Sequence, residues 1–136
     1  MKNLGYTVPT AKSMDEAVSA VKKNAVEYGF SVLHVHDIGA TLAEKGFQRE
    51  PLKIVEICNA KYAHEALDVE VTAALMLLCP IAVYQAKGRT YISTVKPSAI
   101  AGSFSGRSLE FISEQIEVAV LAIVDDSASN SFSAVA

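Results

Sequence analysis

The chain has 136 residues, enough for one domain with a buried core and too few for two domains of ordinary size. Its net charge is −3 and its basic residues are scattered, which argues against a nucleic-acid-binding surface. The longest apolar run, residues 73–83, is interrupted by Pro80 and is too short to span a bilayer. No apolar segment of a secretory signal begins the sequence. We therefore expect a cytoplasmic protein that binds neither nucleic acid nor membrane.

The N-terminal part of the chain predicts a strand, a helix and a second strand. Residues 4–8 have the pattern of a short strand. Ser13 begins a helix because Ser13 and Glu16 can form a capping box, and Gly29 supplies its left-handed C-terminal cap. The next strand covers residues 30–36.

Strict alternation along residues 30–36 predicts two faces for this strand. His34 and His36 share one face with Phe30 and Val32. Asp37 then follows as the N-cap of a short helix over residues 38–45.

The middle of the chain contains the most unusual strand. Residues 52–58 place Glu56 and Cys58 on one face of a strand that is otherwise mainly apolar. Asn59 caps a short helix over residues 60–67. A carboxylate, a thiol and a capping amide therefore lie within four positions of one another.

A β-hairpin follows further along the chain. Its strands are residues 81–85 and 89–95, and Lys87-Gly88 forms the turn. A two-residue loop places Tyr84 opposite Tyr91, which is a favourable aromatic pair across the strands.

Two remaining segments complete the domain. Residues 69–78 fit either a helix or a strand. The apolar stripe of the last helix extends from residue 109 to residue 123, and the polar sequence after it lacks periodicity. We expect one domain over residues 1–124 and a loosely ordered tail over residues 125–136.

The order of elements predicts the fold class. A strand, a helix, four strands and a long helix indicate an α+β domain, with an antiparallel sheet of about five strands and two longer helices on one face. Strands 30–36 and 52–58 carry apolar groups on both sides, so the second face of the sheet needs a cover too. A symmetric partner is the simplest cover, and we expect a homodimer.

Three stretches resemble a known family, the domain of unknown function 302. They are GFSVLHVHDIGATLAEKG (29–46), KIVEICNAKYAHEAL (53–67) and LLCPIAVYQAKGRTYISTVKP (77–97). The resemblance covers roughly residues 6–123. It implies a compact TATA-box-binding-protein-like domain with the order β-α-β4-α, often a homodimer in bacteria and archaea, and no established reaction. The chain departs from the family where it has Ala60 after the Cys-Asn pair, and where Leu78 precedes Cys79 and Pro80 follows it.

Glu56 carries the leading hypothesis about function. A carboxylate among apolar neighbours needs a partner or a raised pKa, and such groups gather at functional sites. We expect a small ligand on the sheet face or in a dimer groove, with Glu56, Cys58, Asn59 and Asp37 as its contacts. A purely structural hydrogen bond of Glu56, and a simple capping role for Asp37, are the alternatives.

The two cysteines give a second hypothesis from a different class. Cys58 stands just before a helix, where the helix dipole favours a thiolate. A thiol-based redox or sulfur-transfer activity at Cys58 or Cys79 is therefore an alternative, although buried, unreactive thiols are the stronger explanation of both. A structural or assembly module without a site is the third possibility. The sequence identifies neither a reaction nor a cofactor.

A metal centre is the remaining candidate. If the two strands pair in register, His34 and His36 converge with Glu56 and Cys58, a mixture of ligands that suits zinc, iron or copper. No ligand pair has a diagnostic spacing. We therefore expect no metal, with His34 and His36 as the candidates should one bind.

Overall fold

The structure is a computed structural model that describes residues 4–101 and 107–129. Its elements in chain order are β1 (Gly5–Thr10), α1 (Met14–Glu27), β2 (Ser31–Asp37), α2 (Ile38–Glu44), β3 (Leu52–Cys58), α3 (Ala60–Val69), the 3-10 helix η1 (Val71–Met76), β4 (Cys79–Ala86), β5 (Arg89–Val95), α4 (Pro97–Ala101) and α5 (Arg107–Ala128). The expected order of strand, helix, four strands and helix is confirmed, with short helices inserted. The likeness to the TATA-box-binding protein stays a prediction.

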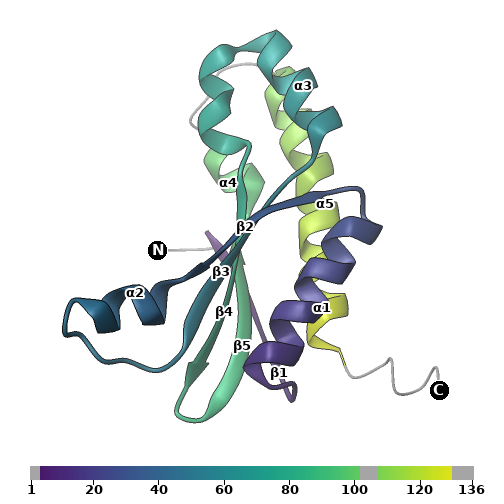
Figure 1. Ribbon diagram of the computed structural model, residues 1–136. Coiled ribbons are helices and arrows are strands. Elements are labelled where there is room, and N and C mark those ends of the chain that lie inside the picture. The colour runs from purple at the N-terminus through teal and green to yellow at the C-terminus, as the bar shows by residue number, and fades with distance from the viewer. Residues whose placement is uncertain (1–3, 102–106, 130–136) are drawn as a thin grey trace.

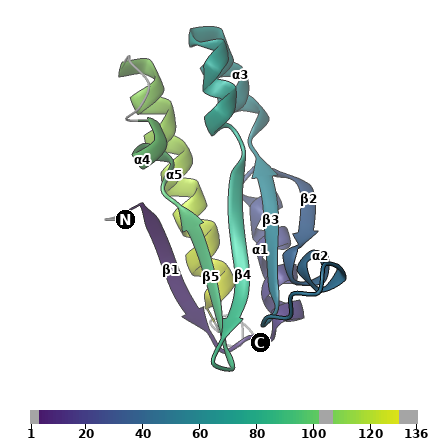
Figure 2. The same ribbon diagram turned by 90° about the vertical axis from the view of Figure 1, so that its left-hand side faces the viewer.

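The strands form one antiparallel sheet with the order β1-β5-β4-β3-β2. Helices α1 and α5 lie together on one face of this sheet (Figure 1). Figure 2 shows the opposite face, where the strands lie in front of both helices and α2 projects beside β2. The prediction of two longer helices on one face is confirmed. Helix α2 projects on the other side, at one end of β2 and β3 (Figure 1), and in the part of the chain that the structure describes no helix lies across the centre of that face.

The core lies between the sheet and the two long helices. The inward side chains of the three central strands are fully buried: Val55, Ile57, Ile81, Val83 and Ile92. Val21 of α1 and Ile123 of α5 are buried opposite them. Burial of such aliphatic side chains supplies most of the free energy that holds the layers together.

Helix α1 begins and ends where the sequence predicts. The Ser13 amide donates to Oε1 of Glu16 at 2.9 Å, and the Glu16 amide donates to Oγ of Ser13 at 3.2 Å. This capping box satisfies amides at the helix start that have no partner within the helix. Gly29 has φ +87°, which ends the helical segment and redirects the chain into β2.

The β4–β5 hairpin turns at Lys87-Gly88, as the sequence predicts. Lys87 has φ 53° and Gly88 has φ 80°, the two positive values of a type I′ turn. Tyr84 and Tyr91 are register partners, and their rings stack with centroids 5.5 Å apart. The carboxylate of Glu50 accepts hydrogen bonds from the amides of Lys87 and Gly88, at 3.1 and 3.4 Å.

Strand β2 contains a register shift between Val32 and His34, so strict alternation was wrong there. Val32 pairs with Ile57 and faces the core, and Leu33 is an extra, half-exposed residue. Beyond this β-bulge, His34 pairs with Glu56 on the face away from the helices. His34 and His36 thus share a face with each other but not with Val32.

Several segments differ from their predicted bounds. Residues 69–78 contain η1. The buried side of α3 is formed by Tyr62 and Ala66, whereas helical spacing predicts Ala60, Ala63 and Leu67, of which Ala60 and Leu67 are exposed. Helix α5 continues to Ala128, so residues 125–128 belong to a helix rather than to a loose tail. The remainder of the predicted tail, residues 130–136, lies outside the described residues. No helix that the structure describes is long and apolar enough to cross a membrane.

Candidate functional site

The uncovered side of the sheet, here called the open face, is formed by the residues that alternate with the core positions. It carries His34, His36, Leu52, Ile54, Glu56, Cys58, Pro80, Ala82, Tyr84, Tyr91, Ser93 and Val95. Its centre is apolar and aromatic, and its ionisable groups lie toward β2. The open face, which is turned toward the viewer in Figure 2, therefore combines apolar residues with a small polar cluster.

A shallow groove hollows the open face from its middle toward the end where β1 and β4 begin and β5 ends. It has a volume of about 330 Å³ and is lined by Leu4, Gly5, Ile54, Pro80, Ala82, Ser93, Thr94 and Val95. These residues come from β1, β3, β4 and β5 and from the residue before β1, so the groove crosses most of the sheet. Its size is at the lower end of the range found for small-molecule sites, and its lining is mostly apolar, as in such sites.

Glu56 lies at the edge of this groove. Its register partners are His34 in β2 and Pro80 in β4, and Pro80 lines the groove. Its Oε1 is 3.8 Å from Nε2 of His36, and the side chain of Glu56 is 28% exposed. The carboxylate is thus partly exposed on the open face, where the sequence predicts a ligand.

The two cysteines are free thiols on β3 and at the start of β4. Cys58 is half-buried, and burial raises its pKa. Cys79 is buried, and burial together with the neighbouring Cys58 raises its pKa to about 12. At Cys58, loss of solvation thus opposes the thiolate that the start of α3 favours, and a reactive thiol there stays a prediction.

Asn59 has its side chain fully engaged in the local fold. Its Oδ1 accepts hydrogen bonds from the amides of Lys61 and Tyr62, at 3.0 and 3.2 Å, and so caps α3 as predicted. Its Nδ2 donates to the carbonyl of Gly29 at 3.3 Å, which ties the start of β2 to the end of β3. These bonds assign Asn59 a scaffold role.

Asp37 lies at the other end of β2, away from Cys58 and Asn59. Its Oδ1 accepts a 2.9 Å hydrogen bond from the amide of Ala40, which confirms it as the cap of α2. Its Oδ2 is 4.0 Å from Nζ of Lys53. The structure thus brings Glu56 and Cys58 onto one surface and separates Asp37 from them.

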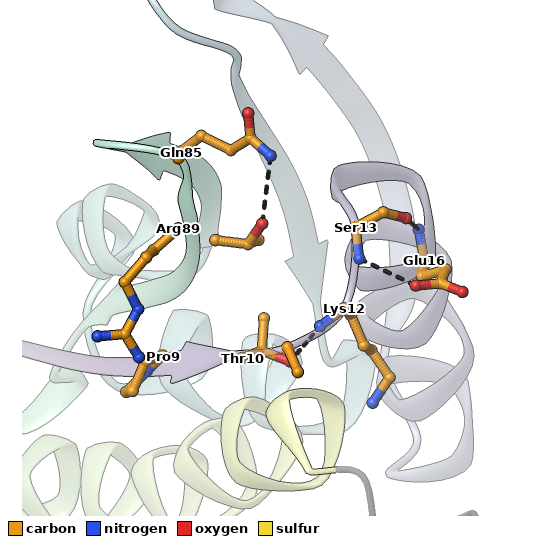
Figure 3. Close-up of a pocket in the computed structure, with 10 residues that line it drawn as sticks. Pro9, Thr10, Lys12, Ser13, Glu16, Gln85 and Arg89 are labelled. Atoms are coloured by element: carbon orange, nitrogen blue, oxygen red, sulfur yellow. Dashed lines mark hydrogen bonds between the residues drawn. The ribbon is translucent and has the colours of Figure 1, made fainter.

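A second cavity, of about 620 Å³, lies where the end of β1 and the start of α1 meet the β4–β5 hairpin (Figure 3). Its polar lining includes Lys12, Ser13, Glu16, Gln85 and Arg89. Much of this lining already has partners: Ser13 and Glu16 form the capping box, and Nζ of Lys12 donates to the carbonyls of Ser127 and Ser129. Sequence reasoning missed this cavity because its walls come from segments about 75 positions apart.

The histidine pair and its carboxylate lie at the β2 side of the open face. The rings of His34 and His36 meet edge to face, with centroids 4.5 Å apart. Among the described residues, no three His, Cys, Asp or Glu side chains are arranged to hold a metal ion as they stand. The strand register nevertheless brings His34, His36 and Glu56 close together, because His34 pairs with Glu56 and His36 lies two positions along the same strand.

Fold and site together define a small α+β protein with a helix-covered sheet and one open, hollowed face. The family model described as "Domain of unknown function DUF302" matches residues 6–126. The chain therefore belongs to the DUF302 family, as its sequence resemblance indicated. It is similar to the crystal structure of an uncharacterized conserved DUF302 protein from Bacillus stearothermophilus, with 29% identity, 93% of this chain and 98% of that chain covered, and a TM-score of 0.87. The comparison with curated proteins gave no match.

Proposed function

We propose that this protein is a homodimeric domain that binds a small, partly apolar ligand, and that the open face serves as both dimer interface and ligand site. The observation that carries the proposal is the apolar groove in the open face. Glu56 and Cys58 stay in the proposed site, and Asn59 and Asp37 are assigned to the scaffold. We also propose a cytoplasmic location, where the free thiols of Cys58 and Cys79 stay reduced.

The composition of the open face supports a second copy of the chain as its cover. Ala82, Tyr84 and Tyr91 lie at its middle, where no like charges would meet across a two-fold axis. Interface cores are depleted of charged residues and enriched in tyrosine. Two such faces could pack at the usual sheet spacing of about 10 Å.

The size of the open face indicates the strength of such a dimer. Strands about 4.8 Å apart, with about 3.3 Å of rise per residue, give a five-stranded face a flat area on the order of 500 Å². Two copies would bury a total on the order of 1,000 Å², the lower limit for a specific interface. We therefore expect a dimer with a dissociation constant in the micromolar range.

The groove and Glu56 indicate the chemical class of the ligand. An aliphatic lining favours an apolar body, and the partly exposed carboxylate of Glu56 favours an N–H or ammonium group at its edge. A second copy would cover the groove and exclude water from it. Both raised thiol pKa values speak against the redox alternative, so we propose binding rather than catalysis.

The dimer is tested by sedimentation velocity and light scattering of three proteins. We expect the unmodified chain to dimerise at micromolar concentration and Ala82→Glu to be monomeric, because two carboxylates would meet at the middle of the interface. Val118→Glu is the matched control, since Val118 lies on α5 and is 73% exposed. A monomeric unmodified chain, or a dimer that Ala82→Glu leaves intact, would contradict the proposed interface.

The ligand site is tested separately, with the dye 8-anilino-1-naphthalenesulfonate as an apolar probe. We expect the dye to bind the unmodified chain and to bind Ala82→Leu more weakly, because the larger side chain fills the groove. Ala74→Leu is the control, since Ala74 is exposed and lies on η1, away from the open face. Native mass spectrometry of protein taken directly from cells should also show a bound small molecule. Equal dye binding by all three proteins would exclude the groove.

A further inference from the structure

The β2 side of the open face gathers three metal-binding side chains from two strands. The bulge at Leu33 turns His34 and His36 onto the open face, where their rings are 4.5 Å apart. Glu56 is the direct register partner of His34. Side chains at such partner positions have Cβ atoms about 5 Å apart, within reach of a common ligand.

We propose that His34, His36 and Glu56 bind a divalent transition-metal ion, with Zn²⁺ the best match. Two imidazole nitrogens and one carboxylate oxygen are a usual protein ligand set for zinc, with a fourth position left to water. Zinc–ligand bonds of about 2.1 Å place tetrahedral donors about 3.4 Å apart. Nε2 of His36 and Oε1 of Glu56 are 3.8 Å apart, so a small adjustment would bring both onto one ion.

His34 completes the site by a side-chain rotation. As they stand, the described side chains form no three-ligand group, because the His34 ring meets His36 edge to face. His34 is exposed, so no packing opposes a change of its rotamer. Moving between staggered rotamers costs little at an exposed position, and metal coordination would compensate for it.

The lack of side-chain hydrogen bonds at His34, His36 and Glu56 favours a metal-binding role over a structural one. At 3.8 Å the contact between His36 and Glu56 is too long for a hydrogen bond. Within residues 4–101 and 107–129, the side chains of these three residues make no hydrogen bond, although their backbones pair in the sheet. Their donor atoms are therefore available to an ion. Because no second partner orients the imidazoles, we expect a dissociation constant on the order of micromolar rather than nanomolar.

The site needs only one chain and does not require the proposed dimer, but it shares Glu56 with the proposed ligand site, so the ion would take the place of the N–H or ammonium group there. His64 offers a matched comparison on α3, because its Nε2 lies 3.5 Å from Oδ2 of Asp68. That pair has the same chemistry, a histidine beside a carboxylate, but lacks a third ligand. His64→Ala therefore removes a histidine and leaves the proposed site intact.

The experiment is a calorimetric titration of the metal-free protein with ZnCl₂, followed by CoCl₂ with visible absorption as a second readout. We expect one ion per chain and the d–d absorption of a Co²⁺ ion in low-symmetry coordination. His34→Ala, His36→Ala and Glu56→Gln should each weaken Zn²⁺ binding by about tenfold or more, because two protein ligands hold zinc poorly. His64→Ala should bind as the unmodified chain does.

Three outcomes would overturn the proposal: no Zn²⁺ uptake by the unmodified chain, unchanged affinity in His36→Ala, or loss of affinity in His64→Ala. All three site residues are at least partly exposed, so these variants should fold, and circular dichroism with thermal melting checks this. A monomeric protein that binds one Zn²⁺ would support the metal site and contradict only the dimer.

Discussion

The hydroxyl of Tyr6, in the first strand, donates a 2.7 Å hydrogen bond to Oδ1 of Asp125, near the end of the last helix. Tyr28 makes a similar 2.6 Å bond to Oδ2 of Asp126. Both bonds stabilise the last turn of α5, residues 125–128, which the apolar stripe of the helix does not reach. The helix is therefore extended by tertiary contacts.

Removal of the first of these bonds should loosen that turn. We expect Tyr6→Phe to lower the free energy of unfolding by less than about 1 kcal/mol, because the bond is solvent-exposed. Amide hydrogen exchange should rise at residues 125–128, and urea unfolding gives the stability change. Tyr62→Phe is the control, since the Tyr62 hydroxyl has no hydrogen bond within the described chain. Unchanged exchange in Tyr6→Phe would contradict this role.

The same two bonds predict a loss of stability at high pH. The hydrogen bond to Asp125 raises the pKa of Tyr6 above 10.0, and the hydrogen bond to Asp126 does the same for Tyr28. The folded state thus holds these protons more tightly than the unfolded state does. Their contribution is complete below pH 10 and is lost as pH rises through the folded-state pKa values. Urea midpoints measured across this range should fall less steeply in the Tyr6→Phe/Tyr28→Phe double variant.

The layer of β-strand isoleucines should dominate stability. Ile57 is fully buried, and Ile57→Ala should cost about 2–5 kcal/mol through lost burial and the cavity that remains. Leu75, on η1, is 83% exposed, so Leu75→Ala should cost almost nothing. Urea unfolding at fixed protein concentration measures both. A large loss in Leu75→Ala would show that another molecule covers η1.

The hairpin turn offers a stabilising substitution. Lys87 has φ 53°, a conformation that asparagine adopts more readily than lysine, and Asn-Gly is the preferred type I′ pair. We expect Lys87→Asn to raise the free energy of unfolding by about 0.5 kcal/mol. Gly88→Ala should lower it by about 1 kcal/mol, because Gly88 has φ 80° and a Cβ there would meet strain but no clash. Thermal melting and urea unfolding check both signs.

The thiols should react slowly in the folded protein. With the pKa of Cys79 near 12 and that of Cys58 raised, few thiolates exist at neutral pH. We expect Cys58 to react with iodoacetamide more slowly than free cysteine does, and Cys79 to react only after unfolding. The rate at Cys58 should rise with pH up to and beyond pH 9.0, the ordinary value for a thiol. A rate that is already constant at neutral pH would restore the redox hypothesis.

Elements with strong local signals were predictable from the sequence. The capping box at Ser13 and Glu16 fixed the start of α1, and Lys87-Gly88 fixed the hairpin and with it the pairing of Tyr84 with Tyr91. Capping boxes and two-residue turns are short-range interactions, so a few neighbouring residues suffice to specify them.

Features that depend on distant contacts were not predictable. The bulge at Leu33 exists because β2 must match β3, and nothing in residues 30–36 marks it. The end of α5 depends on Tyr6 and Tyr28, about 100 positions earlier in the chain. The placement of Glu56 on an accessible face could be inferred, but the groove beside it requires the packing of four strands.

The position of the first strand has a consequence for synthesis in the cell. Strand β1 pairs only with β5, from Gly5 with Val95 to Thr10 with Thr90, and α5 supplies much of the cover for that pair. A ribosome releases β1 long before β5 and α5, so β1 cannot dock until those later segments have emerged. Such long-range closure slows folding and leaves the nascent sheet edge exposed. This small domain should therefore fold only after α5 has left the ribosome, and translation products that stop before α5 should be recognised as unfolded.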